Sequence, residues 1–193
     1  MSEAINVRSE SVIPAAIRAS PGPTQSTDFD RAVLAHLDAA YNLARWLVRD
    51  EHDAEDIVQE ACLRAFRFFG GFRGGNSRAW LLKIVRNTAF TWLKRNQPAD
   101  PRAEFDENFH LALEEAPTLE ASLLRKVDSA MVRGALDELP PEFREVVVLR
   151  DFEELSYKEI ADIAEIPVGT VMSRLARARG KLARSITART RAV

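Results

Sequence analysis

The sequence predicts an all-α protein with two small helical domains joined by an acidic linker, the second containing a helix-turn-helix. Apolar residues recur at intervals of three and four in several long segments, which is the periodicity of amphipathic helices. No segment shows the period-two alternation of a strand. Between residues 97 and 128, prolines and acidic side chains interrupt the helical pattern, so we expect a linker there.

Charge is distributed unevenly along the chain, although the formal net charge is only −2. Residues 61–95 contain eight basic and no acidic side chains, whereas residues 99–128 contain eight acidic and three basic ones. The 193 residues, 46% of them hydrophobic, suffice for one large or two small domains with real cores. The distribution therefore predicts basic segments on either side of an acidic one.

Several function classes are disfavoured by composition. Cys62 is the only cysteine, so an internal disulfide is excluded, and three scattered histidines offer no zinc spacing. We expect no cofactor and no metal. No apolar run reaches the length of a membrane span, and the first 27 residues lack the pattern of a secretory signal. These features predict a cytoplasmic protein without membrane insertion.

The first domain is expected to span residues 28–96, after a mobile N-terminal tail of residues 1–27. Its predicted helices cover about residues 29–48, 53–69 and 79–95, with a charged break at 50–53 and a glycine-rich loop, GGFRGGN, at 70–76. The linker of residues 97–128 would follow, with a short helix near residues 109–115.

The second domain is expected to span residues 129–193. Helices are predicted at about residues 132–139 and 141–150, followed by the helix-turn-helix. There Ser156 and Glu159 match a capping box, and Pro167 ends one helix while suiting the first turn of the next.

The second helix of this motif is predicted over about residues 168–186 and has two distinct stripes. The apolar stripe contains Val171, Leu175, Ala178, Leu182 and Ile186. The polar stripe contains Thr170, Arg174, Arg177, Lys181 and Arg184. A recognition helix needs both, because it packs on its partner helix while its other side enters a grooved polyanion. The alternative, a surface helix with solvated arginines, is less favoured because solvated faces usually mix charge signs.

The helix predicted over residues 53–69 places Asp53, Asp56 and Glu60 on one stripe, which Arg64 continues. One interpretation is purely local: acidic residues suit a helix N-terminus, and Glu60 can pair with Arg64. The other is an acidic docking face for a basic partner. Spacing alone favours the local interpretation.

The glycine-rich loop and the helix after it combine basic and aromatic residues. Phe72 and Arg73 lie in the loop, and one helix stripe contains Lys83, Asn87, Thr91 and Lys94, with Trp80 and Phe90 at its edges. Basic groups follow a phosphate backbone, aromatic faces stack on unpaired bases, and an asparagine can contact a base edge. The alternative for each aromatic is core packing, which is favoured for Trp92, evenly balanced for Trp80 and disfavoured for Phe72.

Five runs in this order resemble those of an extracytoplasmic-function sigma factor, a two-domain subunit of the sigma-70 family that directs bacterial RNA polymerase to promoters. They are DAEDIVQEA at 53–61, FRG at 72–74, WLLKIVRN at 80–87, LPPEFREVVVLRDFEELSYKEIA at 139–161 and PVGTVMSRLARAR at 167–179. The resemblance implies that residues 28–96 are a sigma region 2 domain and residues 129–193 a sigma region 4 domain. It implies initiation of transcription of a specific regulon, with the chemistry left to the polymerase, so the chain itself is not expected to be an enzyme.

The resemblance also implies roles for particular residues. The docking face for core RNA polymerase would consist of Asp53, Asp56, Gln59 and Glu60. The melted non-template strand of the −10 element would meet Phe72, Arg73 and Asn87, to which the pattern above adds Trp80, Lys83 and Lys94. The −35 duplex would meet Thr170, Ser173, Arg174 and Arg177, with Lys181 added from the polar stripe. Many relatives are held inactive by an anti-sigma protein, which is a further expected partner.

Two residues depart from the family pattern. Glu165 stands where the turn commonly has glycine, although an αL backbone is less comfortable for glutamate. Met172 stands where relatives often carry a basic residue. Because Met172 lies away from the polar stripe on the helical wheel, we expect the loss of at most a phosphate contact.

Two other function classes compete with a promoter-specificity subunit. A stand-alone transcriptional regulator would use its first domain to sense a ligand or to dimerise. Such a domain has no need of eight basic residues beside exposed aromatics, which is the feature that discriminates the two hypotheses. An enzyme with a DNA-binding tail lacks support, since no metal cluster, nucleophile set or phosphate loop is found in the sequence.

Overall fold

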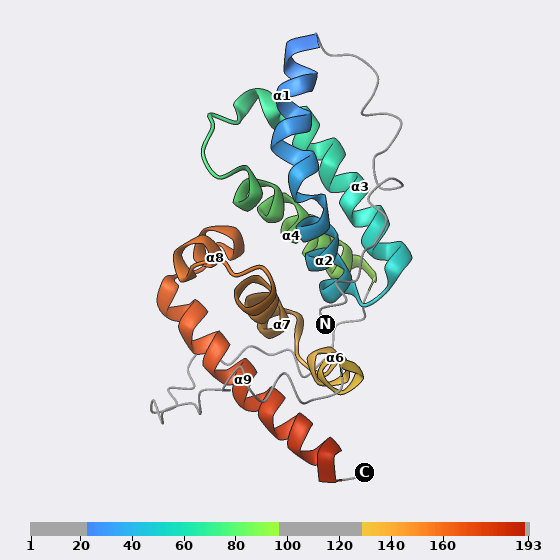
Figure 1. Cartoon of the computed structure of the whole chain (residues 1–193), viewed down its shortest axis with the longest axis vertical. Helices are drawn as coiled ribbons and strands as arrows, with labels where there is room; N and C mark the ends of the chain where they lie inside the picture. Colours follow the sequence, from blue (N-terminus) through green and yellow to red (C-terminus); the bar gives the residue numbers. More distant parts are fainter. Residues whose placement is uncertain (1–22, 97–128, 192–193) are drawn as a thin grey trace, which may run out of the picture. The chain divides into compact units, whose positions relative to one another are not determined.

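The computed structural model describes residues 23–96 and 129–191, which form helices joined by short turns, with no strand among them (Figure 1). The all-α prediction is confirmed. The chain divides into two compact units, one reaching to Asn96 and the other formed by most of the residues after it. Residues 1–22, the expected linker and its short helix lie outside the described residues.

Between residues 23 and 96, the first unit consists of four α-helices and two short 3₁₀ turns. They are α1 (Pro23–Val33), η2 (Leu34–His36), α2 (Leu37–Val48), α3 (Glu51–Phe68), η3 (Phe69–Gly71) and α4 (Ser77–Asn96). The helices α2, α3 and α4 pack on one another, and α1 packs on α4. Leu43, Val58, Leu81 and Val85 are fully buried among them, so each helix turns one apolar face inward.

The boundaries of this unit correct three expectations. The chain is already helical from Pro23, inside the expected tail, and proline is well suited to a first helical turn. The single helix expected over residues 29–48 is interrupted by η2, where the His36 ring lies 3.0 Å from Ser77 Oγ. The charged break is shorter than expected: Arg49 is left-handed, and Asp50 caps α3 by accepting a hydrogen bond from the amide of Asp53 (3.1 Å).

In the second unit, the described residues 129–191 form four α-helices and one π-helical turn. They are α6 (Ser129–Asp137), α7 (Pro141–Val147), η4 (Val148–Phe152), α8 (Tyr157–Ala164) and α9 (Val168–Arg191). The long helix α9 packs against α7 and α6. A regular helix to Arg150 was expected, but the chain widens into the π turn after Val147. The helix α9 also continues past the expected end at Ile186.

A buried arginine joins α6 to α7. Arg144 is completely inaccessible to solvent, and its guanidinium donates hydrogen bonds to the carbonyls of Leu136 (2.9 Å), Asp137 (3.3 Å) and Leu139 (2.6 Å). These carbonyls belong to the last turn of α6 and the chain just after it, where backbone acceptors have no partner within the helix. The Arg144 side chain, which belongs to α7, therefore caps the C-terminal end of α6.

The C-terminal part of α9 is held beside α6 by a polar clamp. Glu138 accepts hydrogen bonds from Ser185 Oγ and from Arg189 Nη2, each at 2.6 Å. The Arg189 guanidinium lies so close to the backbone of α6 that a Cβ atom at Gly134 would be 2.6 Å from Nη1. This clamp connects residues about fifty apart in sequence. Helical periodicity alone does not detect such a contact, so the predicted end of α9 was too early.

Candidate nucleic-acid and protein interfaces

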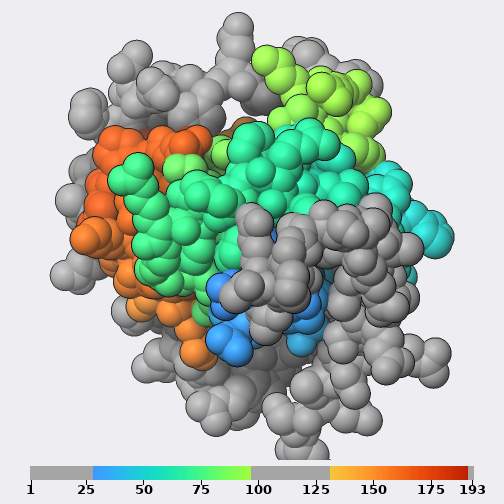
Figure 2. Space-filling model, turned by 90° about the horizontal axis from the view of Figure 1, so that it is seen from above, coloured from blue at the N-terminus to red at the C-terminus, as the bar shows by residue number. Residues whose placement is uncertain are grey.

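An aromatic cluster lies where α3 ends and the glycine-rich loop begins. Phe29 meets Phe66 and Phe69 edge-on, at ring-centroid distances of 5.1 and 5.3 Å. Phe72 stacks on Phe69 at 5.8 Å and lies 4.9 Å from the Trp80 ring. The end of α3 and this loop reach the surface on the face seen in Figure 2 (teal to green). Phe72 and Trp80 are thus half-buried members of one cluster rather than isolated surface rings.

The loop between this cluster and α4 has a defined shape. Gly74 and Gly75 have φ angles of +84° and +100°, which residues with a Cβ rarely adopt. Asn76 then caps α4, since its side chain accepts a hydrogen bond from the amide of Ala79 (3.0 Å). Arg73 is exposed at the tip of the loop. The loop therefore contains an exposed arginine directly after Phe72, which belongs to the aromatic cluster.

The polar stripe of α4 continues away from the cluster. Lys83 and Asn87 are half-buried, and Lys94 is exposed in the last turn of the helix. Arg86 donates a hydrogen bond from Nη1 to Asn87 Oδ1 (3.0 Å), and its guanidinium lies 4.4 Å from the centroid of the Phe90 ring. With its oxygen engaged by Arg86, Asn87 presents its amide NH₂ group as the available donor.

The acidic stripe of α3 is also present on the surface. Asp56 and Glu60 are exposed, and Asp53 and Gln59 are half-buried. Glu60 accepts a hydrogen bond from Arg64 Nε at 2.7 Å, so the local pair expected from the sequence is confirmed. Exposed pairs of this kind contribute only about 0.3–0.5 kcal/mol, so Glu60 can exchange Arg64 for a cation of a partner at little cost.

Two titratable groups inside the first unit have shifted pKa values. Burial raises the pKa of the Cys62 thiol to about 11, so this side chain stays protonated and behaves as a small apolar core residue. Burial, together with the nearby Arg78 guanidinium, lowers the pKa of His36. The His36 ring is therefore held neutral beside Ser77 at ordinary pH.

The turn of the helix-turn-helix follows the sequence prediction closely. Ser156 Oγ accepts a hydrogen bond from the amide of Glu159 (3.3 Å), and the Glu159 carboxylate accepts one from the amide of Ser156 (2.9 Å). The predicted capping box is confirmed. Glu165 ends α8 with φ +58°, so it adopts the left-handed conformation for which glycine is better suited.

The two predicted stripes of α9 differ in how well they match. Val171, Leu175, Ala178 and Leu182 are buried, which confirms the apolar stripe apart from the half-buried Ile186. The polar stripe flanks this buried face rather than opposing it, because it lies only about 120° away on the wheel. Its residues are half-buried at Thr170, Arg174 and Arg177, and exposed at Lys181 and Arg184.

The contacts of individual polar side chains limit what each can offer a ligand. Arg174 has a buried Nε atom, and Lys181 Nζ lies 5.9 Å from the centroid of the Phe143 ring. Ser173 is exposed, and its hydroxyl donates to the carbonyl of Thr170 (3.1 Å). The outermost face of the first turns of α9 is formed instead by Val168, Gly169, Met172 and Ser173.

The structure also reveals positioning residues that sequence patterns did not indicate. Asp151, in the π turn, accepts a hydrogen bond from Arg179 of α9 at 2.7 Å. Its neighbour Arg150 donates to the carbonyl of Leu155 (2.8 Å) and lies 5.1 Å from the centroid of the Tyr157 ring. The π turn therefore places adjacent charged residues so that one holds the start of α8 and the other holds α9. A π bulge has no signature in hydrophobic periodicity.

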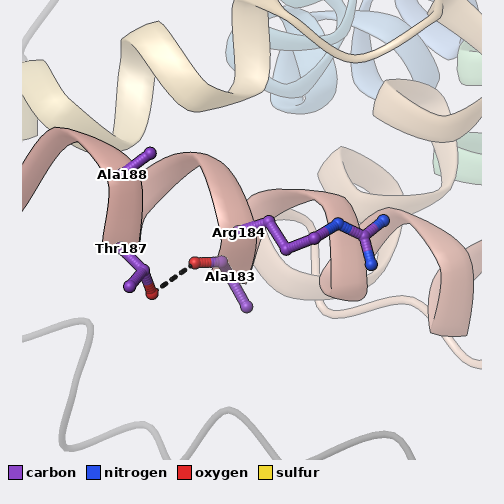
Figure 3. Close-up of a pocket in the computed structure, with 4 residues that line it drawn as sticks. All are labelled: Ala183, Arg184, Thr187 and Ala188. Atoms are coloured by element: carbon purple, nitrogen blue, oxygen red, sulfur yellow. Dashed lines mark hydrogen bonds between the residues drawn. The ribbon is translucent and has the colours of Figure 1, made fainter.

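A shallow hollow on the C-terminal half of α9 offers little for a small ligand. Its described lining residues, Ala183, Arg184, Thr187 and Ala188, all come from this one helix (Figure 3). The Thr187 hydroxyl already donates to the carbonyl of Ala183 (2.8 Å), as the dashed line shows. Within the described parts of the chain, no cluster of three or more potential metal ligands occurs, and no helix combines the length and apolarity needed to span a bilayer.

Comparison with protein families assigns both units. The family model described as Sigma-70 region 2 matches residues 32–98, and the model described as Sigma-70, region 4 matches residues 129–182. The RNA polymerase sigma-H factor of Pseudomonas aeruginosa is 38% identical over 159 residues, which cover 78% of this chain and 82% of that protein. The ECF RNA polymerase sigma-E factor of Escherichia coli K12 is 38% identical over 134 residues, covering 66% and 70%.

Solved structures with the same fold are similar over most of the chain. The sigma factor RpoE in complex with the anti-sigma factor NepR from Bartonella quintana matches with a TM-score of 0.64 and 27% identity, covering 83% of this chain and 98% of that one. CnrH in complex with the cytosolic domain of CnrY matches with a TM-score of 0.60 and 27% identity, covering 86% and 91%.

Proposed function

Because the chain belongs to the extracytoplasmic-function group of the sigma-70 family, we propose that it binds core RNA polymerase in the cytoplasm and directs it to the promoters of a specific regulon. The first unit would dock on the polymerase and capture the −10 element, and the second would bind the −35 element. The observation that carries the proposal is the capped helix-turn-helix, whose second helix has a buried apolar stripe beside a basic one. The polymerase supplies the chemistry.

Docking on the polymerase is assigned to the acidic stripe of α3, namely Asp53, Asp56, Gln59 and Glu60. Exposed carboxylates in a row complement a basic partner surface, and electrostatic complementarity speeds and orients association. Reversing the charge of Asp56 and Glu60 together should weaken binding to core polymerase while helix content in circular dichroism stays unchanged. Asp38→Lys, at an exposed carboxylate of α2, is the control. Equal core affinity of the double variant and the parent would mean that the stripe is only a solvated face.

Capture of the −10 strand is assigned to the aromatic cluster edge and the polar stripe of α4. An unpaired base would stack at the exposed edge of Phe72 and Trp80, while the amide of Asn87 contacts a base edge. Arg73, Lys83 and Lys94 would follow the phosphates, a contribution that fades with salt. Because the two rings already pack on each other at 4.9 Å, the base would extend an existing stack rather than order a free side chain.

Fluorescence anisotropy of the full chain with labelled oligonucleotides tests this assignment. The parent should prefer the single-stranded non-template sequence over its duplex, and the preference should persist as salt rises while total affinity falls. Phe72→Ala should reduce the preference, since stacking contributes roughly 1–3 kcal/mol per base. Phe68→Ala, at a phenylalanine that is 64% exposed outside the ring cluster, should leave it unchanged. If neither variant loses the preference for single-stranded DNA, Phe72 has a role in structural packing alone.

Contact with the −35 duplex is assigned to Thr170, Ser173, Arg174, Arg177 and Lys181. Arg177→Ala should cost about 1–3 kcal/mol of promoter binding, the usual contribution of a base contact. Arg174→Ala should in addition lower stability, because part of its guanidinium is buried. Arg133→Ala, at an exposed arginine of α6, serves as the charge-matched control. Promoter binding unchanged in both helix α9 variants would overturn the assignment of α9 as a recognition helix.

Run-off transcription with core polymerase, followed by mapping of the start sites, is the decisive test of the whole proposal. Promoter-dependent transcripts that require the added chain support it. Specific binding of the promoter duplex without core polymerase, with no such transcripts, would favour a stand-alone regulator. The sigma factor RpoE from Bartonella quintana described above is bound to the anti-sigma factor NepR, so we also propose an anti-sigma partner. Addition of that partner should abolish the transcripts.

A further inference from the structure

Two exposed apolar side chains form a strip at the front of the recognition helix. Val168 and Met172 are 42% and 53% exposed, and they lie one helical turn apart on the same side of α9. Scattered apolar residues on a surface need no explanation, but a pair at this place does. In a helix-turn-helix, the N-terminal residues of the second helix contact base edges in the major groove. We call Val168 and Met172 the front strip.

The residues around the front strip offer little hydrogen bonding to a base. Ser173 is next to Met172 on the exposed side, but its hydroxyl donates to the carbonyl of Thr170 at 3.1 Å. Neither valine nor methionine carries a strong donor or acceptor. Arg174, with its buried Nε, lies on the flank rather than at the front. The Ser173 hydroxyl keeps only its acceptor lone pairs for a ligand, so Val168 and Met172 present mainly apolar surface beside one acceptor.

Charge identifies the partner of this strip as nucleic acid. No acidic residue follows Glu165 in the sequence, whereas α9 carries Arg174, Arg177 and further basic residues on the side of the helix away from Met172. An apolar protein groove would gain nothing from that charge, but a polyanion would. Gly169 fits the same partner, because a Cβ there would contact nothing within 4 Å inside the chain. No packing among the described residues requires this glycine, and its absent side chain leaves room for DNA close to the first turn of α9.

One apolar group distinguishes bases in the major groove, the C5-methyl group of thymine. We propose that Met172 and Val168 pack against thymine methyl groups of the −35 element, and that Met172 is a specificity-determining residue. A basic residue at this position would have added a phosphate or guanine contact instead. This inference rests on the proposed function. The sequence alone predicted that Met172 loses at most a phosphate contact, whereas this inference predicts a different base preference.

Replacing thymine by uracil tests the inference, because it removes the methyl group and leaves every hydrogen-bonding group of the base pair in place. Holoenzyme reconstituted from core polymerase and the full chain is bound to a promoter defined by start-site mapping. Each thymine of the upstream element is then changed to deoxyuridine in turn. At one or two positions the uracil duplex should bind about fourfold more weakly, as expected for loss of one buried methyl-sized group.

The protein variants assign the effect to the strip. With Met172→Ala, the thymine and uracil duplexes should have equal affinity when the substitution is at one of these base positions. Val168→Ala should abolish the affinity difference at a neighbouring base position. Met172→Leu keeps an apolar side chain and should retain the difference. Leu34→Ala, at an exposed leucine of the first unit, should retain it as well.

Two outcomes would overturn the inference: equal binding of every uracil duplex by the parent holoenzyme, or a uracil effect that persists in both alanine variants. Either result leaves the proposed function intact as long as Arg177→Ala still weakens upstream binding. A parent chain that selects no promoter with core polymerase overturns the proposed function and this inference together.

Discussion

The buried guanidinium of Arg144 gives the sharpest prediction about stability. Replacing it by methionine keeps a long unbranched side chain but removes every donor. Two hydrogen bonds with good distances are lost, to the carbonyls of Leu136 (2.9 Å) and Leu139 (2.6 Å), together with a longer one to Asp137. The Leu136 carbonyl would keep only the hydrogen bond from the amide of Leu139 (3.1 Å), and the carbonyls of Asp137 and Leu139 would lose the donor that Arg144 supplies.

The magnitude follows from these two bonds. A hydrogen bond from a charged donor contributes about 1.5–3 kcal/mol. Methionine avoids the cost of burying a charge, which offsets part of the loss. The second unit should therefore lose about 2–4 kcal/mol of unfolding free energy. For a domain of this size, each kcal/mol corresponds to roughly 4–8 °C, so its melting temperature should fall by on the order of 10–20 °C.

The distribution of tryptophans separates the two units in one experiment. Trp46, Trp80 and Trp92 are the three tryptophans of the chain, and all lie in the first unit. Circular dichroism at 222 nm reports helix loss in both units, whereas tryptophan fluorescence follows the first. In Arg144→Met, the part of the circular dichroism transition that comes from the second unit should move to a lower temperature. The midpoint of the tryptophan fluorescence transition should not change.

A matched substitution serves as the control for this prediction. Arg133 is an exposed arginine on α6, so Arg133→Met should change the unfolding free energy by less than about 0.5 kcal/mol. An equally small change in Arg144→Met would refute the argument that its hydrogen bonds cap α6. A parallel fall of the fluorescence transition would refute independent unfolding of the two units.

Three further predictions concern the second unit. Glu165→Gly should raise the urea midpoint, with a gain of about 0.5–1 kcal/mol, since glycine relieves the left-handed backbone but has more freedom when unfolded. Gly134→Ala should raise the unfolding free energy by about 0.5–1 kcal/mol in an Arg189→Ala background. The gain should be smaller in the parent, because the new Cβ atom displaces the Arg189 guanidinium. Equal gains in the two backgrounds of this double-mutant cycle would contradict the close contact. Hydrogen bonds from Ser185 and Arg189 lower the pKa of Glu138, so the stability it adds is present at neutral pH and lost as pH falls through that lowered pKa; Glu138→Gln should flatten the stability–pH curve there.

Local chemistry was sufficient to predict the helix-turn-helix from the sequence. The Ser156–Glu159 capping box and Pro167 act over three or four residues, so their effect does not depend on the rest of the fold. The buried stripe of α9 from Val171 to Leu182 likewise follows from helical periodicity. Charge and aromatic patterns indicated the candidate sites on α4 and α9, and family resemblance favoured the docking face on α3 and named the promoter elements; all three sites remain proposals.

Contacts between distant segments decided the rest. The helix is interrupted near His36, whose ring contacts Ser77, forty-one residues later in the sequence. Arg144 of α7 donates a hydrogen bond to the carbonyl of Leu136 in α6, on the other side of the turn between the two helices. Phe72 joins an aromatic cluster whose members come from four separate segments.

A helical wheel gives the angles between side chains, and so the sequence by itself determined which residues of α9 share a stripe. The wheel cannot say which angle faces solvent, because that depends on where the neighbouring helices pack. Only the tertiary structure decided that Arg174 is half-buried and that Met172 is exposed in the first turns of α9, where the base contacts of a recognition helix are made.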